Sequence, residues 1–340
     1  MPSHTPIPVT ALLASGVDPQ HERVHDFPPG LPEWQESVFY DWIDAGGQVA
    51  GHCRIGLHPD EGRVWFWLFL TDGDTWWAIE APHLPWHEVD TARWAFTGDS
   101  LQFERTVLDP LRSNGLRITG TATAVRGDGI GQTRPVSVDL RFDAVAPPHT
   151  MGARDEVDGN GQTRPAARFE QPMAVTGHLA IGDATHPVTG WGERDHSWGS
   201  RHWAFLDWTF LILHSDSLRL QCADVRFGGA HFVLGFVMEE AMEPIGEATL
   251  DLDLPADLET PCSGRVRIPR KTGPPIEGTV EGLGVVAIDL DHVYRADDAP
   301  QPIHSVYRRA LIRFHPADGG EPLLGWVEWC RRPAWLAEGP

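Results

Sequence analysis

The feature that most constrains the fold is a long succession of strand-length apolar segments joined by short turns. The first half of the chain offers Glu36–Asp44, Val49–Leu57, Val64–Leu70 and Thr75–Glu80, with turn-forming Gly, Pro and Asp between them. Such runs are typical of antiparallel strands connected by hairpins. The sequence therefore predicts a β-meander at the start of the fold.

The same pattern continues towards the C-terminus, and few windows show the 3.6-residue period of a helix. Further strands are predicted at Ala92–Phe96, Leu101–Leu108, Leu116–Val125, Val136–Ala144, Met173–Ile181, Val188–Arg194, Trp203–His214, Leu218–Arg226, Ala230–Met238, Ile245–Leu252, Gly264–Ile268, Ile276–Leu290, Ser305–Phe314 and Leu323–Cys330. Short helices are expected only around Pro8–Ser15 and Pro85–Arg93. The predicted fold class is all-β, and residues 1–33, which are rich in proline, are predicted to form an extended arm packed on a surface.

Length and composition predict two domains. A chain of 340 residues commonly forms two domains. Residues 145–168 are polar and rich in Gly and Pro, which indicates either a domain boundary or a long exposed loop. A boundary there gives domains at 1–150 and 151–340. An antiparallel sheet of about eight strands tends to close into a barrel or split into a sandwich. A barrel of that size can enclose one small apolar ligand.

Charge and motif content exclude several classes of function. The net charge of −21 argues against nucleic acid and anionic membrane surfaces as partners. No apolar run reaches the length of a membrane span, and the N-terminus lacks the features of a secretory signal, so the cytoplasm is the expected location. The chain contains no HExxH, P-loop, GxSxG or dinucleotide-binding motif, so no metal site is expected, and hydrolase, NTPase and dehydrogenase functions lack the residues they require. The four cysteines are far apart and are expected to be free thiols. A homodimer is compatible with these features.

Residues 190–203, GWGERDHSWGSRHW, form the densest mixture of charged and aromatic side chains. The candidate site residues in this segment are Trp191, Glu193, Arg194, Asp195, His196, Trp198 and Trp203. Two interpretations remain open on spacing alone. The segment is either the polar floor of an apolar ligand cavity, or a strand-end turn whose polar groups satisfy one another. In the first case, Asp195 is either held ionised by an arginine or kept protonated as a proton donor, with His196 orienting it or relaying its proton.

A second group of candidates lies on the predicted strand from residue 36 to residue 44. Alternation places Glu36, Tyr40 and Trp42 on one face and Asp41 on the other. These side chains either contact a ligand or form the half-buried aromatic face of an edge strand.

Two further groups have similar alternatives. Trp67 belongs to an aromatic block that forms core or cavity wall, where it could also stabilise a cation. Tyr307 and Glu328 lie on strands predicted to close the second domain. Glu328 is either a second acid or base facing inward, or an outward, solvated carboxylate.

The segment GWGERDHSWGSRHW resembles the Asp-His-x-Trp-Gly signature of the carotenoid 1,2-hydratase (hydroxyneurosporene synthase) and AttH-like superfamily. This group of tandem lipocalin-like proteins also includes kievitone hydratase-type enzymes and some fungal Diels–Alderases. The run FPPGLPEWQESVFYDWIDAGGQVAGHCRIGLHPDEGRVWFWLFL is similar to a bacterial branch of the same group. The resemblance implies a sandwich-like and a barrel-like lipocalin relative, with a ligand cavity in or between them.

The same resemblance implies chemistry on hydrophobic polyenes or polyketides without a cofactor. In the hydratases an acidic residue protonates an alkene, and the resemblance assigns that role to Asp195, with His196 beside it. We therefore expect a lyase or isomerase (a hydratase, dehydratase or cyclase) acting on an isoprenoid-like alkene. The alternatives are a non-catalytic carrier of lipids or terpenoids, and a pericyclase that works through the shape of its cavity.

Overall fold

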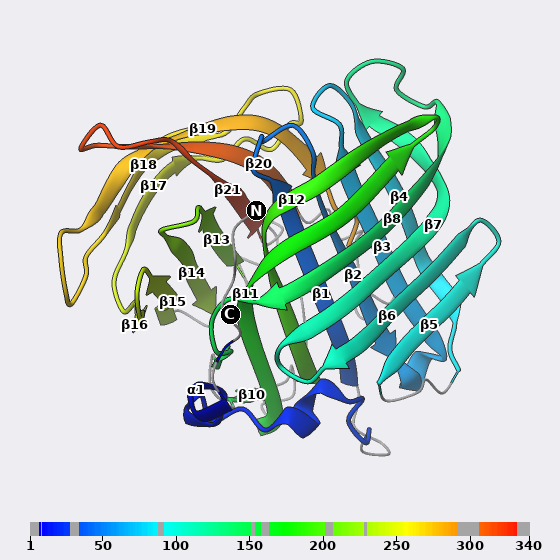
Figure 1. Cartoon of the computed structure of the whole chain (residues 1–340), viewed down its shortest axis with the longest axis horizontal. Helices are drawn as coiled ribbons and strands as arrows, with labels where there is room; N and C mark the ends of the chain where they lie inside the picture. Colours follow the sequence, from blue (N-terminus) through cyan, green and yellow to red (C-terminus); the bar gives the residue numbers. More distant parts are fainter. Residues whose placement is uncertain are drawn as a thin grey trace, which may run out of the picture. The chain divides into compact units, whose positions relative to one another are not determined.

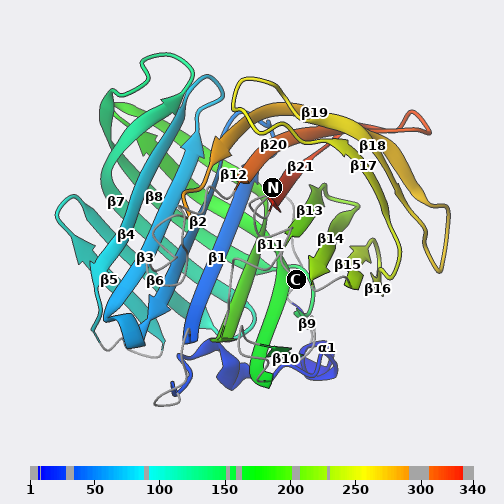
Figure 2. The ribbon, with the colours of Figure 1, turned by 180° about the vertical axis from the view of Figure 1, so that it is seen from behind.

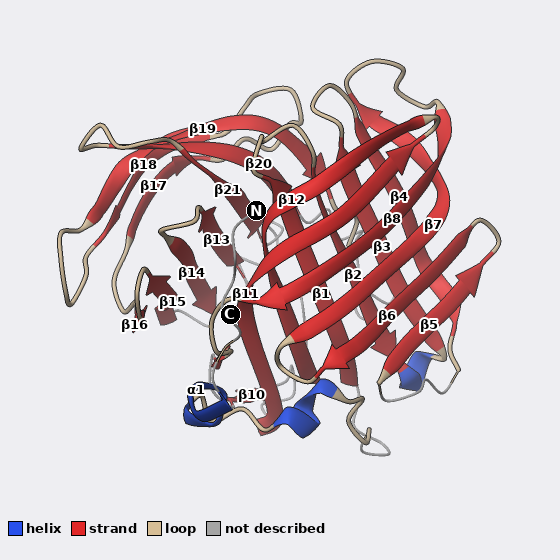
Figure 3. Cartoon of the chain, in the orientation of Figure 1, coloured by secondary structure: helices blue, strands red, loops and turns tan. Residues whose placement is uncertain are grey.

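The computed structural model describes residue 7 and residues 9–27, 34–87, 92–150, 154–157, 163–200, 207–227, 230–290 and 306–331. Strands dominate this part of the chain, and helical structure is limited to a few short segments (Figure 3). The helical segments are α1 (Val9–Ala14) and the 3-10 turns η1 (Pro19–Glu22) and η2 (Pro59–Glu61). The predicted all-β class is confirmed. Of the two predicted helices, the first is α1, whereas the second has strand at both ends and residues 88–91 outside the described part.

The chain divides into two compact units, Met1–Arg201 and His202–Pro340. The boundary predicted at residue 150 lies inside the first unit. The segment predicted as a loop or boundary contains strand instead, and the strands that follow it pair with strands that precede it. The polar, Gly- and Pro-rich composition of this segment indicates a connection, but the end of a domain depends on which distant strands pair with one another. As a result, residues 190–200 of the motif segment belong to the first unit rather than the second.

A closed ring of paired strands forms the first unit (Figure 1). Its members, in the order in which they pair, are β1 (Trp34–Asp44), β2 (Ala50–His58), β3 (Arg63–Thr71), β4 (Trp76–Pro85), β7 (Ser113–Arg126), β8 (Thr133–Ala144), β11 (Thr163–Ile181) and β12 (Ala184–Ser200). The ring closes where β12 pairs with β1. Four shorter strands extend it: β5 (Arg93–Gly98), β6 (Leu101–Asp109), β9 (His149–Thr150) and β10 (Arg154–Val157).

The interior of the ring holds one continuous hydrophobic core. Inward-facing residues of β1, β2, β3, β8 and β11 contribute to it, including Val38, Ile55 and Phe66. Because side chains alternate along a strand, every second residue of β12 also points inward. The even-numbered residues from 190 to 198 face inward, since they pair with the inward-facing residues of β1.

The N-terminal arm does not merely lie on a surface as predicted. Ile7, Leu12 and Val17 join the hydrophobic core of the first unit. The side chain of Asp18 caps η1 by accepting a hydrogen bond from the backbone N–H of Gln20 at 2.9 Å. This turn directs Glu22 inward, where it is 1% exposed. Apolar anchors on both sides of a short turn therefore deliver a charged residue to the core.

The second unit is one open sheet that curves into a half-barrel (Figure 2). Its strands are β13 (Asp207–His214), β14 (Arg219–Phe227), β15 (Ala230–Met238), β16 (Met242–Pro244), β17 (Thr249–Asp253), β18 (Ser263–Ile268), β19 (Ile276–Ala287), β20 (Val306–Pro316) and β21 (Leu323–Arg331). Its own core contains Leu211, Val237 and Trp329. All four cysteines of the chain are free and buried.

Candidate functional site

The candidate site lies where β1, β11 and β12 run side by side in the first unit. Tyr40 of β1 and Gln171 of β11 both pair with Arg194 of β12, so these three side chains project inward from one row. Val38 and Phe169 pair with His196 in the same way. The strand register thus aligns residues that lie far apart in sequence.

A buried ionic group holds the N-terminal arm in the ring. Both oxygens of Glu22 accept hydrogen bonds from Arg194, at 2.7 and 2.9 Å. Arg105 of β6 forms a second ion pair with the same carboxylate, and the backbone N–H of Leu111 donates to it at 2.8 Å. Paired and hydrogen-bonded in this way, the charges can be buried without the cost of an isolated ion.

Neutral side chains complete the hydrogen bonding of this group. Gln171 accepts from Arg194 at 2.7 Å and donates to the backbone carbonyls of Leu111 and Ala146. Arg105 donates to the Tyr40 hydroxyl at 3.1 Å, and that hydroxyl donates to Oδ1 of Asn114. Burial raises the pKa of Tyr40, so its hydroxyl keeps its proton and can donate.

The pKa of Glu22 reflects a competition between burial and charge. Burial alone would raise the pKa of this carboxyl, but the positive charges of Arg194 and Arg105 outweigh it and lower the pKa to about 2. Glu22 is therefore ionised throughout the physiological range. We call Glu22, Arg105 and Arg194 the clamp, because their paired charges hold the N-terminal arm in the ring.

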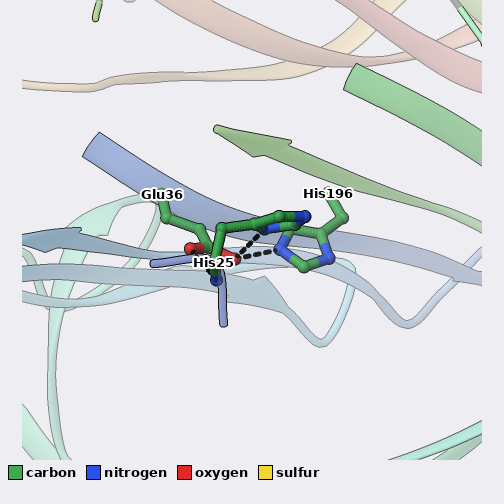
Figure 4. Close-up of side chains that lie close together, drawn as sticks. All are labelled: His25, Glu36 and His196. Carbon is green, nitrogen blue, oxygen red and sulfur yellow. Dashed lines mark hydrogen bonds and ion pairs between the residues drawn. The ribbon is translucent and has the colours of Figure 1, made fainter. Parts of the chain in front are cut away.

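Beside this clamp lies a second polar group, formed by Glu36, His196 and His25 (Figure 4). His196 Nε2 lies 2.7 Å from Oε1 of Glu36, and His25 Nδ1 lies 3.0 Å from the same oxygen. The backbone N–H of His25 donates to Oε2 of Glu36 at 2.8 Å. Glu36 and His196 are 1% and 0% exposed. We call His196 and Glu36 the dyad.

The electrostatics of the dyad define its resting protonation state. Burial lowers the pKa of His196 despite the opposing influence of Glu36. Burial alone would raise the pKa of Glu36, but the hydrogen bonds from His196 and His25 lower it. The resting dyad is therefore a neutral imidazole that donates from Nε2 to an ionised carboxylate. Nδ1 of His196 then carries a lone pair, and no described residue hydrogen-bonds to it.

Aromatic rings surround the dyad. The ring centroids of Phe169 and Trp94 lie 5.6 and 5.8 Å from that of His196. Trp198 stacks on His25 with ring centroids 3.8 Å apart. A low-polarity wall of this kind explains why burial dominates the titration of His196.

His25, Glu36 and His196 could also offer ligands to a metal ion, because their ligand atoms lie within 4.8 Å of one another. Two imidazoles and a carboxylate are a donor set that transition metals accept. However, one nitrogen of each imidazole is already hydrogen-bonded to Glu36, and the neighbouring clamp carries two arginines against one carboxylate. A divalent ion would add buried positive charge, so hydrogen bonding explains the arrangement better.

Asp195, the predicted proton donor, faces away from His196. It pairs in register with Phe39, whereas His196 pairs with Val38, so the two neighbours project to opposite faces of β12. Oδ2 of Asp195 lies 2.8 Å from Nη2 of Arg168 in an ion pair. The predicted contact between Asp195 and His196 is therefore not formed, because adjacent residues of an extended strand cannot share a face.

Three other predicted site residues also lie on that outer face. Trp67 shares a row with Arg54, whose guanidinium carbon lies 5.2 Å from the Trp67 ring centroid. Trp191 and Glu193 lie on this face as well, because side chains alternate along β12 and both residues are two or four positions from Asp195. Trp203 lies outside the described residues. By contrast, five predicted site residues project inward together with His196, namely Glu36, Tyr40, Trp42, Arg194 and Trp198.

Tyr307 and Glu328 belong to the second unit. Tyr307 is buried, and its ring centroid lies 5.4 Å from that of Trp208. Glu328 accepts hydrogen bonds from Arg309 at 2.7 Å and from the indole N–H of Trp208 at 3.0 Å. Glu328 is therefore an ion-paired group rather than an outward, solvated carboxylate, and its role as a second acid or base stays a prediction.

Several functional candidates escaped the sequence analysis, namely Glu22, His25, Trp94, Arg105, Phe169 and Gln171. His25 and Glu22 lie in the arm that was predicted to pack on a surface. A sequence signal did exist: an arm with a capped turn and interspersed apolar residues indicates a segment anchored in a core. Trp94 and Arg105 come from a hairpin whose inward direction depends on long-range register.

A family model described as a domain of unknown function (DUF7064) matches residues 18–333, and the chain belongs to this family. The match spans both units. No curated protein matches the chain in sequence. The family description assigns no activity.

Solved structures show the same fold. An AttH-like protein (NE1406) from Nitrosomonas europaea aligns with a TM-score of 0.54 at 11% identity, covering 91% of this chain and 100% of its own. Kievitone hydratase from Nectria haematococca aligns with a TM-score of 0.51 at 11% identity, covering 92% of this chain and 94% of its own. The predicted resemblance to this group is supported at the level of fold. The carotenoid hydratase assignment stays a prediction. Among the described residues, no helix is long and apolar enough to cross a membrane.

Proposed function

We propose that this protein is a lyase or isomerase that acts on an unsaturated apolar molecule through proton transfer by His196. The observation that carries the proposal is the dyad: a fully buried imidazole is fixed by Glu36 on one nitrogen, and its other nitrogen has no partner in the described part of the chain. A carboxylate that orients a histidine in this way fixes its tautomer and stabilises its protonated form.

The roles of the two residues follow from the protonation state. Neutral His196 takes a proton on Nδ1 from the substrate or from an attacking water molecule. Glu36 stabilises the resulting imidazolium, which then returns the proton to another atom of the substrate. Such a cycle consumes no net proton, as in addition or loss of water, a double-bond shift or a cyclisation.

This mechanism replaces Asp195 with His196 as the proton-transferring group. The reason is geometric: Asp195 is paired with Arg168 on the other face of the strand. The apolar substrate class is supported by the aromatic wall around the dyad, and the solved hydratase with the same fold is consistent with it. An isoprenoid-like alkene is the substrate that we propose.

The test is untargeted mass spectrometry of an apolar metabolite extract from the source organism, incubated with the protein. We expect wild type to consume one component, His196→Gln to reduce the rate at least a hundredfold, and Asp195→Asn to retain most of the rate. General acid–base residues typically contribute a factor of about 10² to 10⁴. Thermal unfolding of each variant checks that the fold is intact.

Three results would contradict the proposal. Loss of activity in Asp195→Asn, with His196→Gln active, would restore the acid role of Asp195. A rate that survives both changes would indicate a pericyclase working through shape. Binding of an extract component without any product would indicate a carrier.

A further inference from the structure

Two buried polar atoms on neighbouring aromatic rings lack a hydrogen-bond partner among the described residues. They are Nδ1 of His196 and the indole Nε1 of Trp94. Both side chains are 0% exposed. Because nearly all buried polar groups in folded proteins have a partner, such a pair calls for a specific explanation.

The two atoms have complementary hydrogen-bonding roles. The indole N–H of Trp94 can only donate, and Nδ1 of His196, with Nε2 donating to Glu36, can only accept. Their ring centroids lie 5.8 Å apart, with the rings nearly perpendicular at 85°. The two rings are therefore neighbours, and one group held between them by hydrogen bonds to Nδ1 and Nε1 would satisfy both atoms.

The bridging group must donate and accept at once. A carbonyl or ether oxygen would satisfy Trp94 and leave Nδ1 of His196 unpaired, and an ammonium group would do the reverse. A hydroxyl oxygen satisfies both. The rings of Phe169 and Trp198 pack against His196, and the charge of the nearby Arg105 is already paired with Glu22, so the remainder of the bound molecule is expected to be apolar.

We infer that the dyad and Trp94 form a binding site for an apolar alcohol or phenol, held by its hydroxyl group between His196 Nδ1 and Trp94 Nε1. The inference rests on the site proposed above, and it names the substrate or product class as one that carries a hydroxyl. Trp94 is then a specificity-determining residue, which recognises the oxygen while His196 takes its proton.

The experiment compares three probes with the same number of heavy atoms: 1-decanol, its isomer methyl nonyl ether, and undecane. Dissociation constants are measured from tryptophan fluorescence for wild type and Trp94→Phe. We expect wild type to bind 1-decanol about tenfold more tightly than the ether or the alkane, because these leave a buried polar atom unpaired. In Trp94→Phe the preference over the alkane should fall several-fold, while undecane binding stays unchanged.

Equal binding of all three probes to wild type would overturn the inference and indicate that a water molecule alone satisfies the two atoms. Absence of saturable binding by any probe would overturn it as well. If Trp94→Phe fails to fold, the comparison of alcohol with ether in wild type decides the question. Binding is measured without turnover, so an alcohol preference without any product would refute the proposed reaction alone. Product formation without an alcohol preference would refute this inference alone.

Discussion

At the scale of single residues, the first unit contains two polar groups with different tasks. Glu22, Arg105 and Arg194 are fully hydrogen-bonded, to one another and to neutral neighbours, and hold the arm in place. Glu36 and His196 form a partly satisfied pair, because Nδ1 of His196 has no partner among the residues that the structure describes. A satisfied ionic group is poorly suited to chemistry because each proton already has a fixed place. The free nitrogen is what distinguishes the dyad as the reactive group.

The clamp predicts a specific pH dependence of stability. The pKa of Glu22 is lowered from its ordinary value of 4.5 to about 2, so its ionised form stabilises the fold fully above pH 4.5. That stabilisation, about 3 kcal/mol at neutral pH, is lost as the pH falls from 4.5 towards 2. In urea unfolding series between pH 6 and pH 3, wild type should lose stability more steeply than Glu22→Gln.

The matched control for this series is Asp99→Asn, which changes an exposed carboxylate of the same unit. It should retain the wild-type dependence on pH. A Glu22→Gln variant whose stability falls as steeply as that of wild type would show that the clamp is not ionised as described.

At the scale of elements, the site depends on close pairing of β1 with β12. A Cβ atom on Gly192 would lie 2.2 Å from the backbone oxygen of Asp41 and 2.9 Å from a methyl carbon of Val175. Gly192→Ala should therefore force the two strands apart and reduce the free energy of unfolding by about 1–3 kcal/mol. Chemical denaturation measures this change.

Gly115→Ala in β7 is the matched control, because its Cβ would make ordinary contact with Leu108 at 3.7 Å. It should leave stability within about 0.5 kcal/mol of wild type. Similar losses in the two variants would show that the tight approach of β1 and β12 is not what fixes the site.

The face of a strand on which each site residue lies could be predicted from the sequence, because side chains alternate along a strand. It correctly placed Glu36, Tyr40 and Trp42 on one face of β1 and Asp41 on the other. Applied to the motif, the same rule separates Asp195 from His196, but the predicted strand ends at Arg194, whereas β12 continues to Ser200. The charged residues concealed the strand, since Arg194 and Asp195 find their partners on segments far away in sequence.

At the scale of the whole molecule, the succession of turns and apolar runs was enough to predict an all-β chain with two β units. The end of the first unit at residue 201 could not be predicted, because β8, β11 and β12 close the ring through pairings that local composition does not encode. The full set of site residues could not be predicted for the same reason. Its members come from the arm, β1, β5, β6, β11 and β12, and only the closed ring brings them together.

The most direct test of the central claim is ¹⁵N NMR of the histidine rings, with the His196 signals assigned by their loss in His196→Gln. We expect His196 to be a neutral imidazole at pH 7, protonated on Nε2 and bare on Nδ1, and to titrate below its ordinary pKa of 6.5 because burial outweighs the effect of Glu36. In Glu36→Gln, the carboxylate that favours the imidazolium is absent, so the titration should move to still lower pH. An imidazolium at pH 7, or a neutral ring protonated on Nδ1, would contradict the account of His196 as a buried base oriented by Glu36.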